Sequence, residues 1–195
     1  MIFAEYIARD PAVPLEVFRH HGRQDWVAEG DVMLANLGRT MKLGPEPHYM
    51  CWWQIHSIAR MDEWEAHFRT PEGRLYAAES PVPRAMRFPR AGLYDAVLGS
   101  GKVAPGLHLV EFFDSDAHEP AVLAEAFGRR AAAAPEARLA YVLRRLPLIG
   151  PDPGGLALWS FDSYAAAEPF LRRPRGGPVS VTAAGLYRNF GDDIP

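Results

Sequence analysis

The chain has 195 residues, of which 48% are hydrophobic and 23% are charged, the balance of an ordinary soluble globular protein. Its formal net charge of -3 provides no electrostatic footprint for nucleic acid or an anionic membrane, so we expect neither as a partner. The single cysteine, Cys51, excludes an intramolecular disulfide, and no apolar run reaches the ~20 residues of a membrane helix, so we expect a cytoplasmic protein.

The first hundred residues predict six elements in the order β-α-β-β-α-β. Apolar, aromatic-rich runs between turn formers indicate strands, and apolar residues at helical spacing indicate helices. The expected strands are 2–8, 32–43, 49–55 and 91–98, and the expected first helix is 14–29. A second helix follows the third strand, where Asp62 and Glu65 resemble a capping box and Met61, Trp64 and Phe68 form an apolar stripe.

The rest of the chain repeats this order. Glu5 matches Glu111 at an offset of 106 residues (111 − 5), and Trp53 matches Trp159 at the same offset. Further matches in the same order are the turn 43–47 with 149–153, Phe68 with Phe170 at an offset of 102, and segment 91–94 with 184–187 at an offset of 93. The corresponding strands are expected at 107–113, 138–149, 155–161 and 183–189, with a helix at 120–133. The series indicates an internal duplication.

These patterns predict an α+β protein of two tandem ferredoxin-like βαββαβ units, residues 1–102 and 103–195. We call these ranges the first half and the second half. Their antiparallel sheets are expected to pair into an α+β barrel.

Segment 62–72, Asp-Glu-Trp-Glu-Ala-His-Phe-Arg-Thr-Pro-Glu, resembles the second-helix segment of EthD-like and NIPSNAP-like members of the dimeric α+β barrel superfamily. The resemblance covers the whole chain as two copies. It implies that two units pair their sheets into one barrel, here within a single chain, while a homodimer remains open. The fold hosts cofactor-free monooxygenases, haem enzymes, isomerases, lyases and transcriptional effector domains, so it does not fix the chemistry.

Histidines distinguish the two halves. The sequence has no Gly-x-Ser-x-Gly, no dinucleotide or phosphate loop, no His-Glu-x-x-His and no cysteine pair. Five of the seven histidines lie in the first half, namely His20, His21, His48, His56 and His67. The second copy has Pro169 in place of His67. We therefore expect a site in the first half or between the halves, with scattered surface histidines as the alternative.

Glu5 is the first acid/base candidate. Strand alternation places it among apolar neighbours, where burial would raise the pKa of its carboxyl group and suit it to proton transfer. The alternative is a structural ion pair with an arginine such as Arg39 or Arg87. The persistence of Glu111 in the second half favours the structural interpretation.

His21 and His67 are the other acid/base candidates. Asp25 lies four residues after His21 on the same helical face and would orient its imidazole. The alternative is that His21 and Asp25 form only an exposed surface contact. His67 flanks the apolar stripe of the second helix and would face the cleft between helix and sheet.

Residues 48–56 carry the densest cluster of distinctive side chains. One strand face would hold Tyr49 and Trp53, and the other His48 and Trp52. We expect Trp53 in the barrel core, and we expect Tyr49, Trp52, His48 and Tyr6 to contact a substrate. Nothing in the local sequence marks Cys51 as a nucleophile, and no metal site is expected.

The sequence thus predicts a small cytoplasmic enzyme that acts on an apolar or aromatic molecule by acid/base chemistry. No tightly bound organic cofactor is expected, and the reaction would be of monooxygenase, isomerase or lyase type. A ligand-binding or stress-response module without turnover and a haem protein of the same fold are the alternatives.

Overall fold

The computed structural model describes residues 1–9, 31–74, 86–114, 119–147, 149–150, 154–174 and 177–190. The strands in these ranges are β1 (Ile2–Arg9), β2 (Val32–Arg39), β3 (Tyr49–Gln54), β4 (Met86–Leu98), β5 (Gly106–Phe113), β6 (Arg138–Arg145), β7 (Gly155–Phe161) and β8 (Val181–Asn189). The helices are α2 (Arg60–Arg69), α5 (Pro120–Ala132) and α6 (Tyr164–Arg172). The expected helix 14–29 lies outside the described residues.

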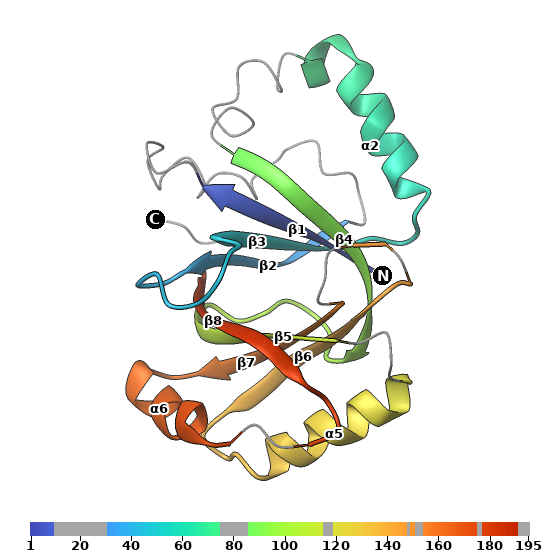
Figure 1. Ribbon diagram of the computed structural model, residues 1–195. Coiled ribbons are helices and arrows are strands. Elements are labelled where there is room, and N and C mark those ends of the chain that lie inside the picture. The colour runs from blue at the N-terminus through green and yellow to red at the C-terminus, as the bar shows by residue number, and fades with distance from the viewer. Residues whose placement is uncertain are drawn as a thin grey trace.

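The eight strands form a closed antiparallel barrel in the order β1-β3-β2-β8-β5-β7-β6-β4. The four strands of each half are neighbours, and the halves join where β2 pairs with β8 and β4 pairs with β6. Helix α2 lies on one side of the barrel, and α5 and α6 lie on the opposite side (Figure 1). Closure leaves no unpaired strand edge, and the predicted barrel is confirmed.

The barrel interior is packed with side chains from both halves. Because successive residues of a strand point to opposite faces, every second residue enters this core. Its largest fully buried members are Trp52, Tyr94, Tyr187, Leu37 and Met50. The interior is therefore a solid core rather than a channel.

A second apolar layer lies between the barrel and the helices of the second half. Helix α5 begins with Pro120 at its first turn, and the Ser163 side chain caps α6 by accepting a hydrogen bond from the Ala166 amide (3.1 Å). Phe127 of α5 and Phe170 of α6 are buried against Trp159, with ring centroids 6.3 and 4.7 Å away. Burying one such ring contributes about 2 kcal/mol, so truncating Phe127 would loosen α5.

The first half lacks an equivalent docking of its described helix. Helix α2 has no buried residue, and only Met61 and Trp64 pack against the outer face of the sheet. The N-cap is Ala59, with no side-chain hydrogen bond, so the expected capping box at Asp62 and Glu65 is wrong. Asp62 instead lies in the first turn of α2, where its negative charge interacts favourably with the helix dipole.

The two halves contact each other through backbone hydrogen bonds at two equivalent turns. The Leu186 amide donates to the Leu43 carbonyl (2.9 Å), and the Leu93 amide donates to the Ile149 carbonyl (3.3 Å). A methyl group on Gly44 would meet the Gly185 backbone at 2.3 Å, which explains the glycine at this close approach. β2 and β6 end at residues 39 and 145 rather than 43 and 149 because the chain turns away there to make these contacts.

Candidate functional site

The outer face of the first half carries a polar row across three strands. Asn36 of β2, Cys51 of β3 and Glu5 of β1 pair in register. The Trp53 indole donates to Glu5 Oε2 (2.9 Å), and the Cys51 thiol donates to Asn36 Oδ1 (3.7 Å). Asn36 is only 2% exposed, yet its Nδ2 has no hydrogen-bond partner among the described residues. We call Asn36, Cys51 and Glu5 the polar row.

The surroundings of Cys51 disfavour the thiolate form that a nucleophile requires. Burial raises the pKa of its thiol well above the usual value, and the charge of Glu5 raises it further. The thiol therefore stays protonated at neutral pH, as the sequence indicates.

The second half has an apolar version of the same row. At the offset of 106, Val142 replaces Asn36 and Ala157 replaces Cys51, and only the glutamate persists as Glu111. Glu111 is 0% exposed and accepts hydrogen bonds from Trp159 Nε1 and Arg130 Nη2, both at 2.9 Å. The glutamate–tryptophan bond is thus common to both halves and structural in origin, whereas the other polar groups of the row belong to the first half.

The buried carboxylate of Asp31 lies immediately before β2 and next to the N-terminal end of α2. The side chain of Asp31 is 0% exposed, and its Oδ2 accepts hydrogen bonds from Arg60 Nε (2.8 Å) and Trp64 Nε1 (3.3 Å). Its Oδ1 is buried and has no hydrogen-bond partner in the described part of the chain. The second half has Ala137 at this register.

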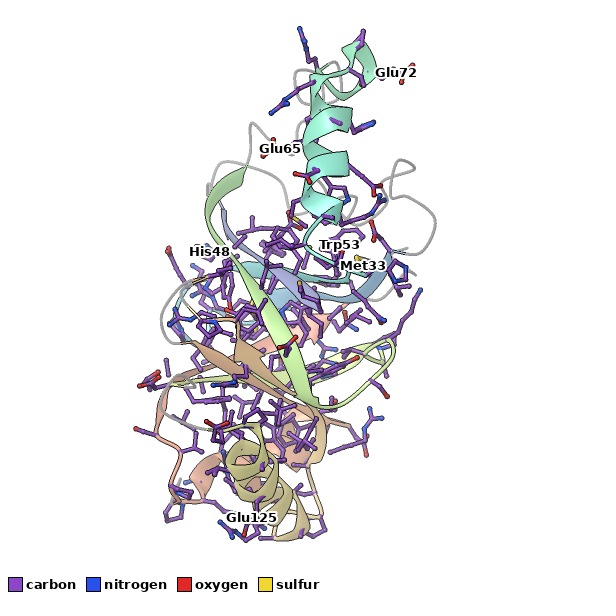
Figure 2. The ribbon with its side chains drawn as sticks, turned by 90° about the vertical axis from the view of Figure 1, so that its right-hand side faces the viewer. Met33, His48, Trp53, Glu65, Glu72 and Glu125 are labelled. Atoms are coloured by element: carbon purple, nitrogen blue, oxygen red, sulfur yellow. The ribbon has the colours of Figure 1, made fainter. Side chains whose placement is uncertain are left out.

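An apolar row lies between Asp31 and the polar row. Met33, Trp53 and Phe3 pair across β2, β3 and β1, and Trp64 of α2 meets Phe3 edge-on with centroids 5.3 Å apart. Figure 2 shows Met33 and Trp53 together at the foot of α2. The expectation that Trp53 lies in the barrel core is wrong, because its side chain faces outward and Trp52 faces inward.

The residues expected to contact a substrate divide between the two faces of the sheet. Tyr49 is buried on the outer face, whereas Tyr6 and Trp52 lie inside the barrel. The Tyr6 and Tyr94 hydroxyls are 2.6 Å apart, and burial raises the pKa of Tyr6 well above its usual value. Trp52 Nε1 lacks a partner among the residues described. A single ligand on the outer face can contact Tyr49 but not Tyr6 or Trp52.

The histidine candidates have different placements. His48 precedes β3 and is half-buried, and its amide donates to the Ile7 carbonyl (3.1 Å). His67 is half-buried on α2, one turn beyond Trp64, with its ring edge-on to Phe68 at 5.8 Å. His21 and Asp25 lie outside the described residues.

His108 is a buried histidine that sequence reasoning did not single out. Its Nε2 lies 3.0 Å from the Ala104 carbonyl, so Nε2 carries the proton, and Nδ1 accepts a hydrogen bond from the Ser160 hydroxyl (3.0 Å). Burial lowers the pKa of His108 to about 4. The neutral ring of His108 therefore links Ala104, in the segment between the halves, to Ser160 of β7 in the barrel.

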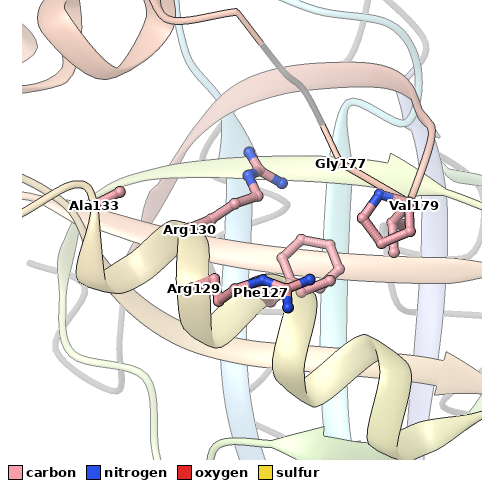
Figure 3. Close-up of a pocket in the computed structure, with 8 residues that line it drawn as sticks. Phe127, Arg129, Arg130, Ala133, Gly177 and Val179 are labelled. Atoms are coloured by element: carbon pink, nitrogen blue, oxygen red, sulfur yellow. The ribbon is translucent and has the colours of Figure 1, made fainter.

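A surface cavity of about 200 Å³ lies in the second half, between α5 and residues 177–179 (Figure 3). Arg129 and Arg130 line it, together with Phe127. Each arginine already has an acidic partner, since Arg129 pairs with Glu125 and Arg130 with Glu111. The cavity therefore offers little uncompensated charge to a ligand.

Asp31 and Asn36 are the functional candidates that sequence reasoning missed. Each is a single polar residue without a motif around it. The signal that could have found them is the repeat itself, because the second copy has Ala137 and Val142 at the same offset. Within the described ranges, no group of three or more His, Cys, Asp or Glu side chains could hold a metal ion.

The chain is an antiparallel barrel with external helices and a polar row on the outer face of the first half only. No family model and no curated protein matches the chain. A solved structure described as a crystal structure study of an anthrone oxidase-like protein is similar, with a TM-score of 0.54 and 11% identity. The match covers 99% of this chain and 94% of that one. At this identity, the likeness shows the fold alone. No described helix is long and apolar enough to cross a membrane.

Proposed function

We propose that the protein is a small-molecule enzyme whose site lies on the outer face of the first half. It acts on an apolar or aromatic metabolite by proton transfer, without a tightly bound organic cofactor, in a monooxygenase, isomerase or lyase type of reaction. One observation carries the proposal: Asn36 Nδ2 is buried without a partner among the described residues, where the second half has Val142.

An unsatisfied buried amide is energetically costly. Leaving such a donor without a hydrogen bond costs about 1–3 kcal/mol, and native structures contain few examples. The second half builds the same sheet with Val142, so the fold itself does not require the amide. A ligand with an acceptor oxygen would supply the missing partner and would lie against the apolar row beside it.

Glu5 is the proposed proton-transfer group of this site. The Trp53 indole holds its Oε2 in the polar row, as the Trp159 indole holds Glu111 in the second half. At the offset of 106, His21 occupies the position of Phe127, which faces Trp159 in the second half. We therefore propose His21 as a further acid/base group of the site, with Asp25 as its carboxylate partner and His67 as a third candidate.

The proposal includes the origin of the two halves. We propose that the chain arose from two ferredoxin-like units, residues 1–102 and 103–195, in the manner of the dimeric α+β barrel proteins. The strand orders β4-β1-β3-β2 and β8-β5-β7-β6 support this proposal. The likeness to a protein named as anthrone oxidase-like is in keeping with an aromatic substrate. We propose a cytoplasmic protein whose barrel is complete within one chain.

The test compares matched substitutions in the two halves. Anthrone serves as the probe, because exchange of its acidic methylene protons for deuterium reports proton abstraction, and oxygen uptake reports any subsequent oxidation. Glu5→Gln should reduce the protein-dependent rates at least about a hundredfold, because an amide cannot accept the proton. Glu111→Gln should leave these rates unchanged.

Two results would contradict the proposal. Exchange no faster than in buffer alone would exclude proton abstraction from this class of substrate. Equal losses of activity in folded Glu5→Gln and Glu111→Gln would assign both glutamates a purely structural role.

A further inference from the structure

We infer that Asp31 is the ligand-binding carboxylate of the first-half site, and that its Oδ1 accepts a hydrogen bond from a hydroxyl or N–H group of the ligand. The inference rests on the proposed function and deepens it. It adds a residue at the opposite end of the apolar row from Glu5 and specifies a chemical group that the ligand carries.

The two oxygens of Asp31 have different surroundings. Oδ2 is fixed by Arg60 and Trp64 from α2, which also fixes the orientation of the carboxylate. Oδ1 is buried without a hydrogen-bond partner among the residues described, and the whole side chain is 0% exposed. A carboxylate oxygen that is removed from water and left unbonded carries a larger penalty than a neutral group. A donor is therefore expected at Oδ1.

The barrel does not need this group of residues for its own packing. In the second half, Ala137 lies at the register of Asp31 and packs in the layer beneath the helices. At the offset of 102 that relates the second helices, Asp162 and Ala166 occupy the registers of Arg60 and Trp64. Asp31, Arg60 and Trp64 are therefore specific to the first half.

The charge of Asp31 is not fully compensated by Arg60. Arg60 is shared, because its Nη1 also contacts Glu63 in the first turn of α2. A single guanidinium thus serves two carboxylates. An ionised carboxylate only accepts hydrogen bonds, so the complementary ligand group is a donor, such as a phenolic hydroxyl or an amine.

The position of Asp31 sets the orientation of the ligand. Asp31 lies two residues before Met33, so it is about 7 Å along the strand from the apolar row. A planar molecule that covers Met33, Trp53 and Phe3 would direct a donor at one edge toward Asp31 Oδ1 and its opposite edge toward the polar row. Asp31 would hold the ligand while Glu5 exchanges the proton.

The test uses naphthol and its methyl ether, which have the same rings but differ in the hydroxyl proton. Binding is measured by isothermal titration at neutral pH. The parent protein should bind naphthol at least about tenfold more tightly, since a hydrogen bond to a charged group contributes about that factor. In Asp31→Asn the ratio of the two affinities should fall below about threefold. Asp162→Asn, the same change at an exposed site of the second half, should keep the parent ratio.

Each outcome has a distinct meaning. If the parent binds neither probe, the proposed aromatic site fails, and the role of Asp31 fails with it. If the parent binds both probes equally, or if folded Asp31→Asn keeps the tenfold ratio, the role of Asp31 is wrong while the site remains.

A second variant covers the case in which Asp31→Asn does not fold. Asp31→Glu keeps the negative charge beside Arg60 but moves the free oxygen by one methylene group. The ratio should then fall at least about threefold, and an unchanged ratio would overturn the inference.

Discussion

Replacing Asn36 by valine should stabilise the protein and weaken ligand binding at the same time. The side chain is 2% exposed and its Nδ2 has no partner among the described residues, so removing it recovers about 1–3 kcal/mol of desolvation cost. The lost Cys51 thiol contact, at 3.7 Å, is weak. Valine also fits the pleated strand well. The net gain should be at least about 1 kcal/mol in the free energy of unfolding.

Thermal and urea unfolding measure this gain. For a chain of this length, 1 kcal/mol raises Tm by about 2–4 °C. The matched control is Val142→Asn, which places a new amide under the packed helices of the second half and should cost about 1–3 kcal/mol. Naphthol affinity should fall in Asn36→Val. If Asn36→Val instead destabilises the protein by more than 1 kcal/mol and leaves binding intact, Asn36 is a structural residue and does not bind the ligand.

Two further predictions concern the junctions between the halves. Because the folded-state pKa of His108 is about 4 and the unfolded value is about 6.5, the unfolded chain takes up the proton first on acidification, and stability falls between pH 6.5 and 4 by about 3 kcal/mol. Urea unfolding across this range should show that His108→Gln loses correspondingly less, and identical pH profiles would refute the assignment. Gly44→Ala should cost more than about 3 kcal/mol, because it adds a backbone clash with Gly185 to the strain at φ +117°, whereas Gly101→Ala, at φ +74° with nothing within 4 Å, should cost only about 1–2 kcal/mol by thermal unfolding.

The barrel follows from the sequence because the repeat constrains it. Strand runs and turns recur in the same order at offsets of 106, 102 and 93, and pairing the two four-stranded sheets removes their free edges. The limits of individual elements were harder to predict. Residues 40–43 continue an apolar pattern, but Met41 and Lys42 adopt left-handed backbone conformations in the turn that clasps the other half. The hydrophobic pattern of a short segment carries no information about such a long-range contact.

The site was less accessible to sequence reasoning, for a physical reason. The alternation of side chains along a strand places Trp52 and Trp53 on opposite faces of the sheet. It does not tell which of them lies inside the barrel, because side chains on the outer face are buried as well. Glu5 stood out because strand alternation places it among apolar neighbours, whereas its repeat as Glu111 explains only the bond to tryptophan that the two halves share. Asp31 and Asn36 differ between the copies, and their burial becomes visible only in three dimensions.

The asymmetry of the halves has an energetic logic. Asp31 Oδ1 and Asn36 Nδ2, which lack a partner in the described part of the chain, together cost about 2–6 kcal/mol, a large fraction of the 5–15 kcal/mol that stabilises a typical domain. The aromatic layer beneath α5 and α6 and the shared barrel core offset this cost. A ligand present at a hundred times its Kd would return about 2.7 kcal/mol, which is of the same order as the penalty. In the function that we propose, the first half holds polar groups that lack a partner among the described residues ready for a ligand, while the second half, closed into the same barrel, keeps the chain folded.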